Sequence, residues 1–121
     1  MNQDIVAAKK ILDTNISCVI CYKGAVFTND KPYNKAIIEF MNSGFDFSMF
    51  SLAITDIDLL TASIISKLDI KGIFSYRISR RSLDLLNKRN VEIYYNELIE
   101  EELEDFKEDM DIDSYIVKNR L

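Results

Sequence analysis

The order of apolar patterns along the chain constrains its fold more than any other feature of the sequence. Runs rich in β-branched and aromatic residues, typical of strands, occupy residues 16–22, 25–28, 50–54, 72–76 and 91–95. Stretches with apolar residues at helical spacing occupy residues 4–13, 29–42, 55–68, 79–90 and 96–110. The first two strands flank Lys23-Gly24 and predict a β-hairpin, whereas the later strands alternate with helices. We therefore expect an α/β protein, a three-layer α/β/α sandwich with a mixed sheet: an N-terminal antiparallel hairpin followed by parallel βα units.

A chain of 121 residues is expected to form a single α/β domain spanning residues 1–121. Hydrophobic residues make up 48% of it, which is ample for a core. No apolar run approaches the roughly 18 residues that a membrane span requires. The N-terminal residues also lack the pattern of a signal peptide. We expect a cytoplasmic protein without a membrane partner.

Charge is distributed unevenly along the sequence. Residues 97–113 contain ten acidic side chains and one basic side chain, Lys107, and so carry a net charge of −9. Residues 1–96 carry twelve basic and ten acidic side chains, or +2. The apolar residues Ile99, Leu103, Phe106 and Met110 recur at helical spacing, which predicts an acidic C-terminal helix packed on the domain. Such an acidic element disfavours nucleic acid as a partner.

The residue types available exclude several chemistries. Histidine is absent, which rules out Ser-His-Asp and Cys-His mechanisms. Cys18 and Cys21 have the spacing of a metal knuckle or a redox pair. In a strand, however, residues three apart point to opposite faces, so we interpret both as buried structural cysteines. We expect neither a metal nor any other cofactor.

Candidate ligand residues follow two of the predicted strands. Thr55, Asp56 and Asp58 begin a predicted helix after the strand at 50–54, with Thr55 and Asp58 forming a capping box. Capping alone explains both acids, because carboxylates suit a helix N-terminus. The functional alternative makes Asp56 an acceptor for a ligand hydroxyl or amino group, since ligands bind beyond the carboxyl ends of such strands.

The second candidate segment holds Ser79, Arg80, Arg81 and Ser82 at the start of the next predicted helix. Two guanidinium groups, two hydroxyls and free backbone N–H groups together predict a site for an anionic or nucleotide-like molecule. Two alternatives remain open. The arginines are ordinary exposed residues, or they form ion pairs with the acidic helix of the same or another subunit.

The order of elements and several segments resemble a prokaryotic orphan deaminase-like family of unknown function, domain of unknown function 1893. The segments that carry the resemblance are Cys18–Phe27, Ala53–Asp56 with Ala62, Ile73–Ser79, Leu83–Leu86 and Val91–Tyr95. The chain departs from the family pattern at Ile57, Leu60 and Thr61, which replace Lys, Gly and Lys. The resemblance implies a divergent member with a cytidine deaminase-like fold.

Zinc deaminases place a His or Cys with a nearby Glu at one helix start and Pro-Cys-x-x-Cys at another. The corresponding residues here, 29–32 and 55–58, include neither histidine nor cysteine, so we expect no zinc-dependent deamination. Three functions follow. The first is a non-catalytic protein that binds a small anionic or nucleotide-like ligand, or acts by interaction, including as a homodimer. The second is a metal-independent enzyme using Asp56 with Arg80 and Arg81, and the third is a structural partner acting through the acidic helix. A deep cleft lined by Asp56 and Arg80 would favour a ligand-binding function. If side chains fill this position instead, an interaction function would be favoured.

Overall fold

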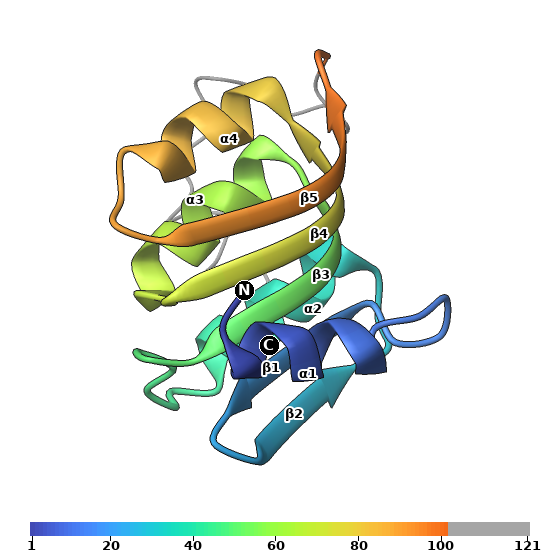
Figure 1. The fold of residues 1–121 in the computed structure, drawn as a ribbon, viewed down its shortest axis with the longest axis vertical. Coiled ribbons are helices and arrows are strands. Elements are labelled where there is room, and N and C mark those ends of the chain that lie inside the picture. Colours follow the sequence, from blue (N-terminus) through green and yellow to red (C-terminus); the bar gives the residue numbers. More distant parts are fainter. Residues whose placement is uncertain (102–121) are drawn as a thin grey trace.

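The computed structural model describes residues 1–101 and has the expected mixed α/β architecture (Figure 1). Its helices are α1 (Gln3–Ile11), α2 (Tyr33–Asn42), α3 (Leu59–Leu68) and α4 (Arg80–Asn87). Its strands are β1 (Cys18–Tyr22), β2 (Ala25–Asn29), β3 (Ser51–Ile57), β4 (Gly72–Ser79) and β5 (Glu92–Ile99). None of the helices in the described part of the chain is long and apolar enough to cross a membrane.

The five strands form one sheet in the order β2-β1-β3-β4-β5. β1 is antiparallel to both β2 and β3, whereas β3, β4 and β5 are parallel. The hairpin forms at the expected turn, where Lys23 and Gly24 both adopt positive φ angles of 45° and 89°. Two-residue turns with positive φ angles match the right-handed twist of the flanking strands. The predicted combination of an antiparallel hairpin and parallel βα units is confirmed.

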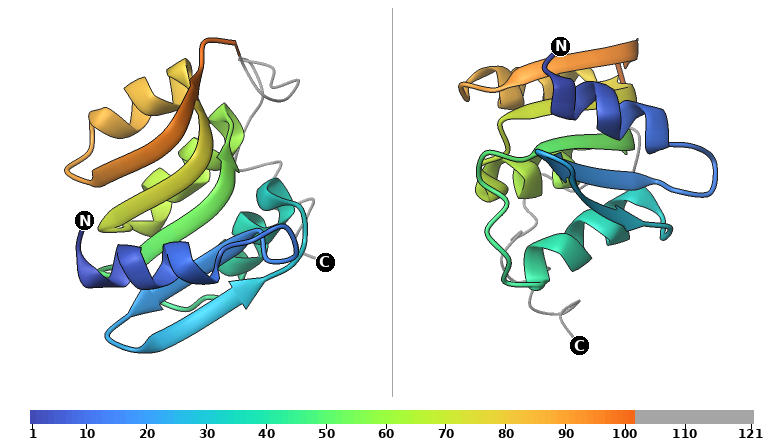
Figure 2. Two further views of the ribbon diagram at one scale, coloured as in Figure 1. Left: turned by 45° about the vertical axis from the view of Figure 1, so that its right-hand side comes forward. Right: turned by 60° about the horizontal axis from the view of Figure 1, so that its bottom comes forward.

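Helices cover both faces of the sheet but are divided unequally between them. α2, α3 and α4 pack on one face, and α1 alone packs on the other (Figure 2). The larger apolar cluster therefore lies beneath the three helices, where Ile54 and Ile73 are fully buried. Ile93 is only half-buried, because β5 lies at the edge of the sheet. The smaller cluster joins α1 to Val19, Cys21, Ala53 and Phe74.

Two predicted boundaries between a strand and a helix are wrong. β3 continues through Thr55, Asp56 and Ile57, so the capping box from Thr55 does not form, and Asp58 caps α3 instead. The helix that was expected to begin at Asn96 does not begin there, because β5 continues to Ile99.

The physical reason is the parallel ladder. Asp56 and Glu97 lie on either side of Arg77 in register, so pairing with β4 extends both neighbouring strands beyond their apolar runs. Polar residues at these positions suggested that the strands had ended. Residues 97–99 of the predicted acidic helix are therefore strand, and residues 102–113 lie outside the described part of the chain.

Candidate functional site

The carboxyl end of the parallel strands is the expected place for a ligand in an open α/β sheet. β3 and β4 are neighbours, so the two predicted segments, 55–58 and 79–82, reach the same end of the sheet. α3 and α4 begin there, directly after the strands. The structure thus brings the predicted site residues together, and their side-chain contacts decide what they can do.

Asp58 is buried and links the starts of two helices. Its Oδ1 accepts the backbone N–H of Thr61 at 2.8 Å, which caps α3. Its Oδ2 accepts the hydroxyl of Tyr33, the first residue of α2, at 3.2 Å. Both carboxylate oxygens are therefore engaged within the protein. The sequence predicted that Thr55 caps this helix, with Asp58 three residues later, and it did not indicate the partner Tyr33.

Asp56 and Arg77 form an ion pair across β3 and β4, with 2.5 Å between Oδ1 and Nε. The Asp56 carboxylate is the main cause that raises the pKa of Arg77, with smaller contributions from Glu97 and Tyr33. The Arg77 side chain is 49% exposed, whereas that of Asp56 is mostly buried. Arg77 was not among the predicted site residues, and the parallel register that places it opposite Asp56 is the signal that identifies it. Thr55 donates its backbone N–H to the carbonyl of Ser17 at 3.0 Å.

Ser79 and Ser82 are buried and bind each other. The Ser79 hydroxyl accepts the backbone N–H of Ser82 at 3.2 Å and caps α4, as predicted. The two hydroxyl oxygens lie 2.6 Å apart and share a hydrogen bond. These polar groups are consequently directed at one another and not toward an exposed anion.

Arg80 forms an ion pair with Glu100, with Nη2 and Oε1 separated by 3.0 Å. Its Nε also lies 3.3 Å from Oε2, so the contact is bidentate. Hydrogen bonding to Arg80 lowers the pKa of Glu100 below its ordinary value. Glu100 belongs to the acidic stretch of the sequence, which favours the interpretation that Arg80 pairs with that stretch. Arg81, the next residue, is exposed.

Two cavities lie elsewhere. One of about 440 Å³ opens at the amino end of β4, with Ile65, Ile70, Leu86 and Val91 in its wall and Arg89 at its rim. The other, of about 540 Å³, lies between the end of β2 and α2. Neither is lined by any of the predicted site residues Thr55, Asp56, Asp58, Ser79, Arg80, Arg81 or Ser82.

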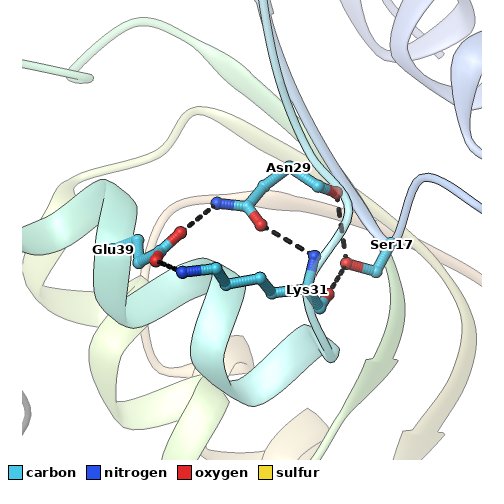
Figure 3. Close-up of polar contacts among 4 residues, drawn as sticks. All are labelled: Ser17, Asn29, Lys31 and Glu39. Carbon is cyan, nitrogen blue, oxygen red and sulfur yellow. Dashed lines mark hydrogen bonds and ion pairs between the residues drawn. The ribbon is translucent and has the colours of Figure 1, made fainter.

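A polar network closes the wall of the second cavity (Figure 3). Glu39 of α2 accepts the side-chain amide of Asn29 at 2.6 Å and pairs with the ammonium of Lys31. Asn29 in turn accepts the backbone N–H of Lys31 at 2.9 Å. The hydroxyl of Ser17 donates to the carbonyl of Lys31. These groups are satisfied by one another, and the network ties the end of β2 to α2.

The cysteines lie as the strand geometry predicts. Cys18 packs in the cluster under three helices and Cys21 in the cluster under α1, on opposite sides of the sheet. Burial raises the pKa of the Cys18 thiol far above its ordinary value, and burial together with Asp4 raises that of Cys21. Within residues 1–101, no three His, Cys, Asp or Glu side chains cluster in a way that could hold a metal ion.

Comparison with known proteins finds similarity in structure but not in sequence. No family model matches the chain. No curated protein matches it either.

A solved DUF1893 family protein from Thermotoga maritima superimposes with a TM-score of 0.75 and 20% identity, over 98% of this chain and 88% of that one. A diaminohydroxyphosphoribosylaminopyrimidine deaminase/5-amino-6-(5-phosphoribosylamino)uracil reductase from the same organism gives 0.52 and 17%, over 76% and 34%. The dCMP deaminase of cyanophage S-TIM5, in complex with dCMP and dUMP, gives 0.50 and 12%, over 78% and 98%. One of these structural neighbours is thus a member of the family that the sequence resembles. The chain has a cytidine deaminase-like fold.

Proposed function

We propose that this protein is a non-catalytic interaction protein of the cytoplasm, built on a deaminase-like fold. The observation that carries the proposal is the set of internal contacts at the carboxyl end of the parallel strands. Asp58 holds Thr61 and Tyr33, and the hydroxyls of Ser79 and Ser82 hold each other. A side chain held in this way has fewer hydrogen-bonding positions left for a substrate and is fixed in orientation by its neighbour.

Electrostatics at the same end of the sheet supports this proposal. Arg77 is neutralised by Asp56, and Arg80 is neutralised by Glu100. The further carboxylates of Asp58 and Glu97 lie nearby. Because each of these two arginines already has an acidic partner, a phosphate or carboxylate ligand would have to compete with a carboxylate in order to bind.

A small-ligand function is the second candidate, and two observations favour it. The hydroxyls of Thr61 and Ser75 are buried without a hydrogen-bond partner among the described residues. Such groups ordinarily bind water or a ligand. In addition, the solved dCMP deaminase with the same fold binds dCMP and dUMP. On this alternative, a nucleotide-like molecule would bind between 55–58 and 79–82, with Arg77, Arg80 and Arg81 facing its anionic group.

A thermal-shift screen separates the two candidates. The probes are dCMP, dUMP, other nucleotides and phosphorylated metabolites. A ligand present at a hundred times its Kd would stabilise the native state by about 2.7 kcal/mol. We expect no such shift in the wild-type protein. A saturable shift that disappears in both Asp56→Asn and Arg80→Ala, but persists in Lys10→Ala on the far helix, would replace the interaction proposal with the ligand proposal.

A further inference from the structure

β2 is an edge strand without the features that usually protect one. No other described strand pairs with its outer side, and its sequence, Ala-Val-Phe-Thr-Asn, has no charge and no proline. The opposite edge, β5, carries Glu92 and Glu97. Proteins commonly use charged side chains, proline or bulges to keep edge strands from pairing with other chains. The β2 edge, defined as the outer side of Ala25–Asn29, lacks these devices.

The backbone of β2 is oriented to accept another strand. The carbonyl of Asn29 points toward β1, because it accepts the N–H of Ser17 at 3.0 Å. Backbone groups alternate in direction along an antiparallel strand. The N–H and C=O groups of Val26 and Thr28 therefore point to the open side. Four hydrogen-bonding groups are thus presented in one row.

Large apolar side chains lie on both faces beside this row. Val26 is 44% exposed on the α1 face, since its register partner is Cys21. On the other face, Phe27 packs against Phe45 with ring centroids 5.2 Å apart, and Phe45 is 51% exposed. Exposed aromatic rings next to an unpaired strand are typical of an interface.

Both ends of β2 are fixed before any partner binds. At one end, the backbone N–H of Lys23 donates to Asp4 of α1 at 3.0 Å. At the other, Asn29 belongs to the network with Lys31 and Glu39 (Figure 3). A rigid edge loses little conformational entropy when a strand is added to it.

From these observations we propose that a second copy of this chain pairs with the β2 edge; this proposal rests on the interaction function and names its partner. A two-fold axis at Phe27 places Val26 of each copy opposite Thr28 of the other, in antiparallel pairing. Each copy then offers the same row of donors and acceptors to its mate, and the two sheets become one. Phe45 of both copies lies beside the paired Phe27 rings.

Charge favours a second copy at this edge over other parts of the surface. The chain carries a net charge of −5, so two copies repel in general. At β2, Lys31 is paired with Glu39, and the strand itself is uncharged. The β2 edge is therefore a part of the surface where self-association meets little repulsion.

Sedimentation of the full chain over a wide range of concentration tests the proposal. We expect a dimer in the wild type and at least about tenfold weaker association in Val26→Lys. The reason is that the lysine ammonium group beside the paired strands would lose part of its hydration. The matched control is Tyr95→Lys on β5, where Tyr95 is 40% exposed, and it should dimerise as the wild type does. Circular dichroism of both variants checks that they are folded.

A second readout fixes the register. In the double variant Val26→Cys/Thr28→Cys, oxidation should yield a covalent dimer, because the substituted residues face each other across the two-fold axis. A wild-type protein that is monomeric at every concentration overturns the β2 pairing. The proposed interaction function is then still tested separately by the thermal-shift screen. The pairing is also overturned if Tyr95→Lys dissociates the dimer and Val26→Lys does not. It is equally overturned if a monomer shows protected amides at Val26 and Thr28, because a segment of the same chain would then occupy the β2 edge.

Discussion

The carboxyl end of the parallel strands and the β2 edge differ in how their polar groups are satisfied. At the carboxyl end, where the fold offers a ligand site, the side chains of Asp58, Ser79 and Ser82 bond to one another or to neighbouring helices. At the β2 edge, the backbone of Val26 and Thr28 faces outward beside exposed apolar groups. Several side chains are bonded internally in the region where a ligand is expected, whereas the region that a sheet usually protects presents unpaired backbone groups among the described residues. This contrast is the physical basis of the interaction function that we propose.

The largest expected effect comes from removing the closure at Asp58. Asp58→Ala loses the cap of α3 and the carboxylate that accepts the Tyr33 hydroxyl, so the free energy of unfolding should fall by about 2–4 kcal/mol. Urea denaturation measures the change. Asp58→Asn, which keeps a capping oxygen, should recover most of the loss.

Asp56→Ala is the matched control from the same segment. Asp56 pairs with the half-exposed Arg77, and such pairs contribute under about 1 kcal/mol. If the two alanine variants were equally stable, Asp58 would not be closing the junction between α2 and α3.

The second effect concerns the start of α4. Ser79→Ala removes a buried cap and leaves the Ser82 hydroxyl without a partner, so unfolding should become about 1–2 kcal/mol easier. Arg80→Ala, one residue later, should unfold close to wild type, because its ion pair with Glu100 is exposed. Thermal melts of both variants distinguish a serine that caps α4 from an arginine in an exposed ion pair. A destabilised Arg80→Ala with an unchanged Ser79→Ala would reverse these roles.

The smallest effect is a change in titration at the anchor of β2. Hydrogen bonds from Lys31 and Asn29 lower the pKa of Glu39 below its ordinary value. A lowered carboxyl pKa means that the contact stabilises the native state above the ordinary pKa and is lost as the pH falls through the lowered one. Carbon-detected NMR should show the pKa of Glu39 rising in Lys31→Ala. An unchanged value would show that the network of Figure 3 does not form in solution.

Much of the fold could be predicted because the apolar periods are strong. The hairpin at Lys23-Gly24, the parallel units and the divergence of Cys18 and Cys21 all follow from local pattern. The ends of β3 and β5 could not be predicted, since residues such as Asp56 and Glu97 become strand only by pairing with Arg77. Pairing of this kind is a tertiary effect that polar local sequence conceals.

The sequence predicted that the candidate residues lie together at the carboxyl end of neighbouring strands, but it did not predict the contacts that they make. Serine and aspartate at a helix start predict caps, and Asp58 and Ser79 are caps. What the sequence did not contain was the identity of each remaining partner. Tyr33 lies 25 residues from Asp58, and Glu100 lies 20 residues from Arg80. These long-range partners determine how the predicted site residues are held, and local sequence does not reveal them.

Amide hydrogen exchange tests the contrast between the two regions most directly, because it reports on both in one experiment. We expect the amides of Thr61 and Ser82, held by Asp58 and Ser79, to be protected at every protein concentration and unaffected by dCMP. We also expect the amides of Val26 and Thr28 to gain protection as the concentration rises and the dimer forms. Rapid exchange at Thr61 and Ser82 that slows when dCMP is added, with no concentration dependence along β2, would contradict the account.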